Sequence, residues 1–185
     1  MCGRFGLSHS WEHIHAAFGL VCQPFALIAR FNIAPSQNIL AVIRNGSREA
    51  SPQIGEVTGG GVLERVPAFL RWGLVPAWAK EPDMGERMIN ARAETVVEKP
   101  SFRAAFRRRR CIIPASGFFE WQTRGGDPKQ PVWISRPDGG LISFAGLWEA
   151  WLGPDGSELK TAAIETTEAN EPLRPFHRRM PVILN

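Results

Sequence analysis

Apolar residues in short runs or in alternation with polar residues predict strands along most of the chain after residue 38. The predicted strands lie at 39–43, 131–135, 141–145, 158–164 and 181–184. Several are separated by turn sequences, namely Asn45-Gly46, Pro137-Asp138-Gly139-Gly140 and Pro154-Asp155-Gly156. These residues tolerate a positive φ or fix φ, as chain reversals require. Strands joined by short turns pair in antiparallel fashion, so the pattern predicts mainly antiparallel sheet.

Two segments have the spacing of short amphipathic helices. In residues 10–20, Ser10 is placed to cap the first turn, and Ile14 and Phe18 fall on one face. In residues 101–109, Phe102 and Phe106 are four positions apart and also fall on one face of a helix. We therefore expect one α+β domain dominated by antiparallel strands, with a few short helices.

Composition narrows the class of protein. The chain has 185 residues, of which 44% are hydrophobic and 22% charged, as in an ordinary single globular domain. It contains no run of about 20 apolar residues, and its first ten residues lack the apolar core of a secretory signal. The three cysteines include no CxxC pair, so neither disulfides nor a zinc site are expected. We expect a cytoplasmic protein without a metal or an organic cofactor.

Charge suggests a class of partner. The formal net charge is +4, and the basic residues are 18 Arg against only 4 Lys. Because the guanidinium fork matches phosphate bidentately, an Arg-rich surface suits nucleic acid. A genome that favours Arg codons explains the same count equally well, so composition leaves both interpretations open.

Cys2 is the residue with the most specific chemistry. Removal of Met1 would leave a 1,2-aminothiol, whose amine and thiol have ordinary pKa values of about 8 and 8.5. The amine forms a Schiff base with an aldehyde, and the thiol then adds to that imine and closes a five-membered thiazolidine. The position of Cys2 by itself is also compatible with a cysteine that occurs there by chance and has no catalytic role.

The sequence around Cys2 and six ordered blocks decide how we interpret it. The blocks are MCGRF at 1–5, FNIAP at 31–35, RWGLVPAW at 71–78, INARAET at 89–95, RRCIIPA running into GFFEW across 109–121, and HRRMPVIL at 177–184. Together they resemble the SRAP family, the SOS-response-associated peptidases that crosslink to abasic sites in single-stranded DNA. The resemblance spans nearly the whole chain and implies a β-rich α+β fold with an electropositive channel for single-stranded DNA.

The resemblance also implies catalytic roles for four residues. Cys2 would be the covalent nucleophile after self-processing removes Met1, and Asn90 would orient the amine and the sugar hydroxyl. Glu120 would be the acid/base carboxylate, and His177 would help to open the sugar ring and reverse the crosslink. Without the family, Glu120 is either a solvent-facing strand residue or a carboxylate in an apolar pocket, and His177 is equally part of a basic surface.

Contacts to DNA follow from the same resemblance. It implies phosphate contacts from Arg4, Arg92 and Arg179, and loop contacts beside the DNA from Asn32, Pro35 and Trp78. The run 107–110 of four arginines is predicted to lie on the second helix and to point around its circumference, mostly as a solvated face.

The chain departs from the family pattern at several positions. It has Ala79 where a second aromatic often follows Trp78, Phe119 where Tyr is common, and Arg178 where an acidic residue or His is often found. It also stops at Asn185, so we expect residues 1–185 to be a SRAP domain without the family's C-terminal extension.

The predicted function is a monomeric sensor of abasic sites in single-stranded DNA that forms a thiazolidine crosslink through Cys2, with autoproteolytic removal of Met1. Two alternatives remain. One is a thiol peptidase that uses Cys2 and His177, although no protease-type signature surrounds Cys2. The other is a module that binds single-stranded DNA without covalent chemistry.

Overall fold

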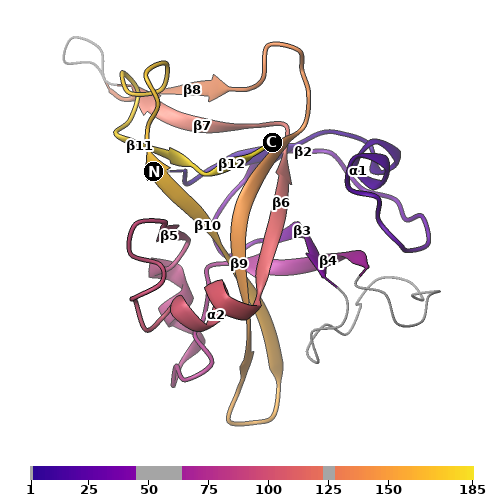
Figure 1. The fold of residues 1–185 in the computed structure, drawn as a ribbon, viewed down its shortest axis with the longest axis vertical. Helices are drawn as coiled ribbons and strands as arrows, with labels where there is room; N and C mark the ends of the chain where they lie inside the picture. The colour runs from indigo at the N-terminus through magenta and orange to yellow at the C-terminus, as the bar shows by residue number, and fades with distance from the viewer. Residues whose placement is uncertain (1, 45–63, 123–127) are drawn as a thin grey trace.

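The centre of the molecule is a closed barrel. The computed structural model describes residues 2–44, 64–122 and 128–185. Five strands form the ring, namely β3 (Asn38–Arg44), β4 (Arg65–Trp72), β6 (Arg110–Ala115), β9 (Ile142–Leu152) and β10 (Glu158–Glu168). Their order is β10-β4-β3-β6-β9, and the ring closes because β10 also pairs with β9. The two longest strands, β9 and β10, form the hairpin that extends downward in Figure 1.

Three short strands are attached to the barrel. β5 (Asn90–Arg92) runs parallel to β10, and β11 (Arg179–Pro181) runs antiparallel to it. β12 (Ile183–Leu184) pairs with β9. Thr166 of β10 is opposite Arg92 in β5 and opposite Pro181 in β11, so β10 brings residues near 90 and near 180 together.

A second sheet lies across one end of the barrel (Figure 1). Its order is β2-β1-β7-β8, and all its pairs are antiparallel. The strands are β1 (Phe5–Leu7), β2 (Arg30–Ile33), β7 (Gly117–Gln122) and β8 (Gln130–Ile134). Only Ser116 separates β6 of the barrel from β7 of this sheet, so the two sheets are joined by a sharp turn.

Aromatic rings from both sheets meet in the core. Phe5 of β1 contacts Trp72 of β4, with ring centroids 5.2 Å apart, and Phe144 of β9 at 6.0 Å. Phe118 of β7 contacts Phe144 at 5.8 Å. All four rings are buried, and each buried ring of this size contributes about 1.5 to 3 kcal/mol. This packing holds β1 and β7 firmly against the barrel.

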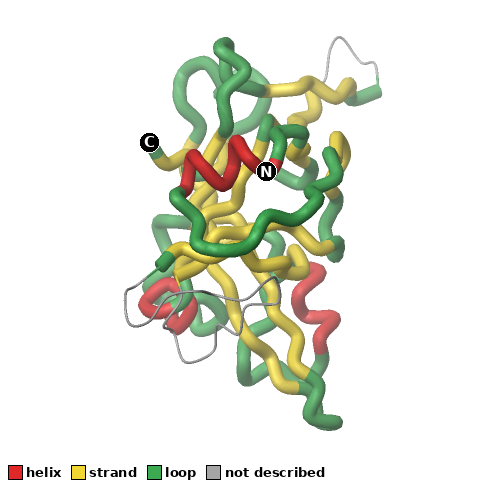
Figure 2. Tube along the Cα trace, turned by 90° about the vertical axis from the view of Figure 1, so that its right-hand side faces the viewer, coloured by secondary structure: helices red, strands yellow, loops and turns green. Residues whose placement is uncertain are grey.

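The helices are few and short, as Figure 2 shows in red. α1 (Trp11–Phe18) begins after Ser10, whose hydroxyl accepts a hydrogen bond from the His13 amide, and ends at Gly19 with φ 57°. The other two are the 3-10 helix η1 (Pro82–Arg87) and α2 (Arg103–Arg108). None of the helices in the described ranges is long and apolar enough to span a membrane.

The expected fold class is confirmed, since nine of the eleven strand pairs in the described residues are antiparallel. The turns after Pro137 and Pro154 are present, with Gly139 at φ 67° and Gly156 at φ 81°. The Asn45-Gly46 turn falls outside the described residues.

Two details of the prediction are wrong. Residues 181–184 are not one strand, because the chain crosses from β10 to β9 at Val182, whose amide donates to the Glu165 carbonyl. The arginines at 107–110 are not all helical. α2 ends at Arg108, Arg109 forms an ion pair with Glu149 at 2.7 Å, and Arg110 begins β6.

Candidate functional site

Cys2 is buried where the chain enters the second sheet, three residues before β1. Its Sγ lies 3.9 Å from the Arg4 carbonyl oxygen. Burial raises the pKa of the Cys2 thiol, and the negative charge of Glu120 raises it further. The thiol is therefore protonated near neutral pH, and the carboxyl group of Glu120 lies close enough for its charge to act on it.

Asn90 fixes the Cys2 backbone from the other side. It begins β5, where it is opposite Ile164 of β10. Its Nδ2 donates a hydrogen bond to the Cys2 carbonyl oxygen at 3.0 Å. Its Oδ1 is buried and accepts no hydrogen bond in the described part of the chain. An unsatisfied buried acceptor costs about 1 to 3 kcal/mol, so this oxygen is available for a donor on the substrate or on the chain terminus.

Glu120 lies on the inner face of β7. Side chains alternate along a strand, and Glu120 shares the face of Phe118, which is packed in the core. It is 4% exposed. The interpretation of Glu120 as a solvent-facing strand residue is therefore wrong, because its side chain is buried.

His177 is held by the backbone of β11. Its Nδ1 lies 2.9 Å from the amide nitrogen of Arg179, which donates to it, and 3.2 Å from the Arg179 carbonyl oxygen. No hydrogen bond or ion pair between described residues joins His177 to Cys2, Asn90 or Glu120. The structure thus joins Asn90 to Cys2 by a hydrogen bond and places Glu120 where its charge acts on the Cys2 thiol, whereas His177 lies beside Arg179.

Four arginines line one surface hollow, which we call the Arg92 hollow. Its lining residues are Arg92, Glu168, Ala169, Arg174, Arg178 and Arg179. β5 and β11 supply Arg92 and Arg179, and the turn before β11 supplies the rest of the basic residues. The predicted phosphate contacts at Arg92 and Arg179 are therefore neighbours. The sequence analysis did not identify Arg174. Its place in the hollow is evident only from the turn before β11, which brings Arg174 close to Arg92 and Arg179.

Arg179 is the most constrained of these arginines. It donates to both carboxylate oxygens of Glu94, at 3.2 and 2.9 Å, and to the Thr166 carbonyl at 2.6 Å. The hydrogen bonds from Arg179 lower the pKa of Glu94. Arg92 and Arg174 are exposed and form no ion pair within the described ranges. Exposed arginines of this kind can meet phosphate without first breaking an internal pair.

The remaining predicted contacts lie on two loops and on β2. Arg4 donates to the Asn32 side-chain oxygen at 2.9 Å, so these two residues form one exposed polar pair. Pro35 is half-buried, and Trp78 is 57% exposed. The backbone after Trp78 is anchored, because the indole of Trp151 donates to the Ala79 carbonyl at 2.7 Å. Trp78 is thus an exposed ring on a fixed loop.

Metal binding has no support in the described segments, which contain no group of three or more His, Cys, Asp or Glu side chains placed to hold an ion. The residues near Cys2 instead offer an amide and a carboxyl group, which suit proton transfer and orientation.

Comparison with known proteins places the fold and these residues in a family. The family model described as SOS response associated peptidase (SRAP) matches residues 1–185, so the chain belongs to the SRAP family. It is 42% identical over 186 residues to the abasic site processing protein YoqW of Bacillus subtilis, covering all of this chain and 76% of that protein. It is 37% identical over 145 residues to the abasic site processing protein HMCES of Gallus gallus, covering 66% of this chain and 43% of that one.

Solved structures agree with this placement. A protein from Bacteroides thetaiotaomicron has a TM-score of 0.79 at 27% identity, covering all of this chain and 77% of the other. A protein from Bordetella bronchiseptica has a TM-score of 0.75 at 27% identity, with coverage of 100% and 84%. The barrel with its second sheet is therefore the fold of these relatives.

Proposed function

We propose that this protein processes abasic sites in DNA by forming a covalent crosslink through Cys2. The observation that carries the proposal is the arrangement of Cys2, whose carbonyl is held by Asn90 and whose thiol lies within the field of Glu120. Similarity to proteins named for abasic site processing supports the class of substrate. We propose single-stranded DNA as the form of the substrate.

The chemistry begins with hydrolysis of the Met1–Cys2 peptide bond, which releases methionine and a free α-amine on Cys2. This amine adds to the aldehyde carbon of the ring-opened sugar and gives a carbinolamine. Loss of water gives an imine, and addition of Sγ to the imine carbon closes the thiazolidine. In the crosslinking steps one C–N and one C–S bond form, the C=O double bond, one N–H bond and the S–H bond break, and one water is released. The earlier hydrolysis of the Met1–Cys2 bond consumes one water.

Three side chains assist these steps in different ways. Glu120 gives a proton to the departing carbinolamine hydroxyl and accepts the proton of the Cys2 thiol, whose raised pKa makes such a base necessary. Asn90 orients Cys2 without competing for its protons, because an amide does not titrate. His177 lies next to the arginines and assists opening of the sugar ring.

DNA is held by charge and by stacking. Exposed Arg92 meets the backbone phosphates in the Arg92 hollow, and Arg4 with Asn32 forms a second contact. The exposed ring of Trp78 and the half-buried Pro35 supply apolar contacts to the bases. None of these contacts reads a base edge, so binding does not depend on sequence.

The test is intact mass and denaturing-gel mobility after incubation with a single-stranded oligonucleotide carrying one abasic site. We expect a product that forms only with the damaged strand and only when Met1 has been removed. Cys2→Ala and a variant with one extra residue ahead of Cys2 should both give no product. Crosslinking by a protein with a blocked N-terminus would overturn the proposal, and salt-sensitive binding with no crosslink would identify a non-covalent module.

The geometry gives less support to a thiol peptidase. That chemistry needs a thiolate activated by a neighbouring imidazole, whereas burial raises the pKa of the Cys2 thiol and His177 bonds to the Arg179 amide. Hydrolysis of a peptide library by the processed protein without DNA would favour the peptidase.

A further inference from the structure

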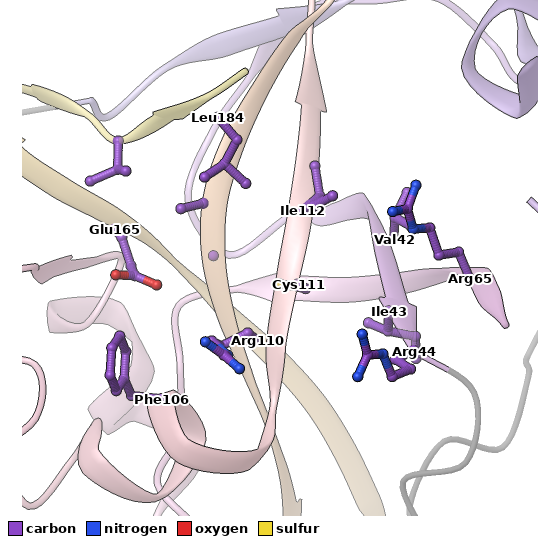
Figure 3. A pocket seen from close by; sticks show the side chains of 13 residues that line it. Val42, Ile43, Arg44, Arg65, Phe106, Arg110, Cys111, Ile112, Glu165 and Leu184 are labelled. Atoms are coloured by element: carbon purple, nitrogen blue, oxygen red, sulfur yellow. The ribbon is translucent and has the colours of Figure 1, made fainter. Parts of the chain in front are cut away.

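A second group of arginines lines a groove on the barrel wall, which we call the Arg44 groove. The arginines come from three strands: Arg44 from β3, Arg65 from β4 and Arg110 from β6 (Figure 3). Apolar side chains form the rest of the surface, among them Phe106, Ile112 and Leu184. The cavity volume is about 450 Å³, within the range of pockets that hold small ligands.

The strand register places like charges next to one another in this groove. Arg44 and Arg65 are directly opposite in the β3–β4 pair. Arg110 lies two residues before Ile112, which is opposite Val42, two residues before Arg44. Continuing that antiparallel register brings Arg110 level with Arg44. Like charges directly opposite are destabilising, so the free protein carries a cost here that a bound anion would offset.

These guanidinium groups have few internal partners. Arg65 donates to the Phe18 carbonyl at 3.2 Å. Neither Arg44, Arg65 nor Arg110 forms an ion pair with a residue that the structure describes. The contrast with Arg109 is informative, because that neighbour is paired with the buried Glu149. The three arginines of the groove are thus available to an external anion.

One acidic residue also lines the groove. Glu165 lies beside Phe106 and Arg110 in Figure 3. Burial raises the pKa of Glu165, and the positive charge of Arg110 opposes that shift. A single buried carboxyl group against three exposed guanidinium groups leaves the groove strongly positive.

The geometry points to a second nucleic-acid site, in which the Arg44 groove binds backbone phosphates while its apolar surface contacts sugars or bases. This inference rests on the proposed function for its choice of partner. Guanidinium groups bind phosphate bidentately, and a positive groove with apolar contacts is typical of single-strand binding without sequence preference. Charge complementarity therefore favours a nucleic-acid strand.

The distance between the Arg44 groove and the Cys2 region determines how long a DNA strand must be to reach both. Arg110 starts β6, while Ser116 at its far end leads into the sheet that carries Glu120. Six residues of strand span about 20 Å. Even at the compact rise of a stacked helix, about 3.4 Å per nucleotide, a 30-nucleotide strand covers about 100 Å. A strand of this length therefore reaches both the Cys2 region and the Arg44 groove.

The test measures binding of an undamaged 30-nucleotide strand across a range of salt. For Arg44→Ala we expect the Kd of this strand to rise about fivefold and the magnitude of the salt slope to fall by about 0.7, as for one lost phosphate. Arg44→Ala with Arg110→Ala should double the change in slope. The matched control is Arg103→Ala, which removes an exposed charge from α2 outside the groove.

Stability separates this role from a structural one. Because Arg44→Ala relieves repulsion by Arg65, its Tm should equal or exceed that of the unaltered protein while its affinity falls. Equal salt slopes for Arg44→Ala and Arg103→Ala would overturn the inference. So would tight, Arg44-dependent binding of a free deoxynucleoside monophosphate, which would make this a mononucleotide site. Undamaged strands form no crosslink, so a failure of the crosslinking proposal would leave this result intact.

Discussion

The groups around Cys2 and the arginines of the Arg92 hollow share strand β5 but are constrained to different degrees. Asn90 and Arg92 are the two ends of β5, with only Ala91 between them. Asn90 is tied to the Cys2 carbonyl, whereas Arg92 is exposed and forms no ion pair with another described residue. Chemistry needs fixed geometry, and phosphate binding needs accessible charge, and the two ends of one short strand meet these different needs.

The largest expected effect comes from the buried centre. Glu120→Gln keeps the size of the side chain but removes its ability to exchange protons. We expect the crosslinking rate to fall by about 100-fold or more, with the affinity for undamaged strands unchanged. Single-turnover gel assays measure the rate. Glu98→Gln, at an exposed position, is the control, and equal rates for Glu120→Gln and the control would remove Glu120 from the mechanism.

A smaller effect is expected from Asn90→Ala. The substitution removes the hydrogen bond to the Cys2 carbonyl, so the N-terminal residue loses its orientation. A hydrogen bond of this kind contributes about 1 kcal/mol, which corresponds to a rate about five- to tenfold slower. Asn90→Asp tests the same point, because it keeps the acceptor and loses the donor. Full activity of both variants would contradict an orienting role.

The exposed arginines should change affinity and leave chemistry intact. Arg92→Ala is expected to weaken binding about threefold to tenfold and to lower the magnitude of the salt slope by about 0.7. At saturating DNA its crosslinking rate should match that of the unaltered protein. Fluorescence anisotropy across a salt series measures both quantities. A rate defect that persists at saturation would mean that Arg92 acts in the chemical step.

The smallest effect concerns the Glu94–Arg179 pair. Arg179 lowers the pKa of Glu94, so the pair stabilises the fold above the ordinary pKa of Glu and is lost as pH falls through the lowered pKa. Because the Glu94 side chain is 44% exposed, Glu94→Gln should cost less than about 1 kcal/mol at pH 7. Thermal melts should show this difference at pH 7 and a smaller difference as the pH falls below the ordinary pKa of Glu. A difference that grows on acidification would contradict this assignment.

Sequence reasoning found long elements better than short ones. Parts of β9 and β10 were predicted from their apolar residues and from the Pro-Asp-Gly turn that lies between them. Both strands extend beyond the predicted ranges. β5, with three residues, and β4, which contains Pro67, carry no local strand signal. Their pairing with β10 depends on contacts more than 60 residues away in sequence, which local periodicity does not report.

The sequence by itself determined the chemistry available to this protein. It supplies a cysteine at residue 2, a carboxylate between aromatic neighbours, an Arg-rich composition and the motif blocks that identify the family. It did not decide which face of β7 carries Glu120, nor that Arg174 joins Arg92 in one hollow, nor that Arg44 lies opposite Arg65. Those relations depend on strand pairing and on which surfaces the core buries. Only the tertiary structure decided them, because burial and register are set by the whole chain.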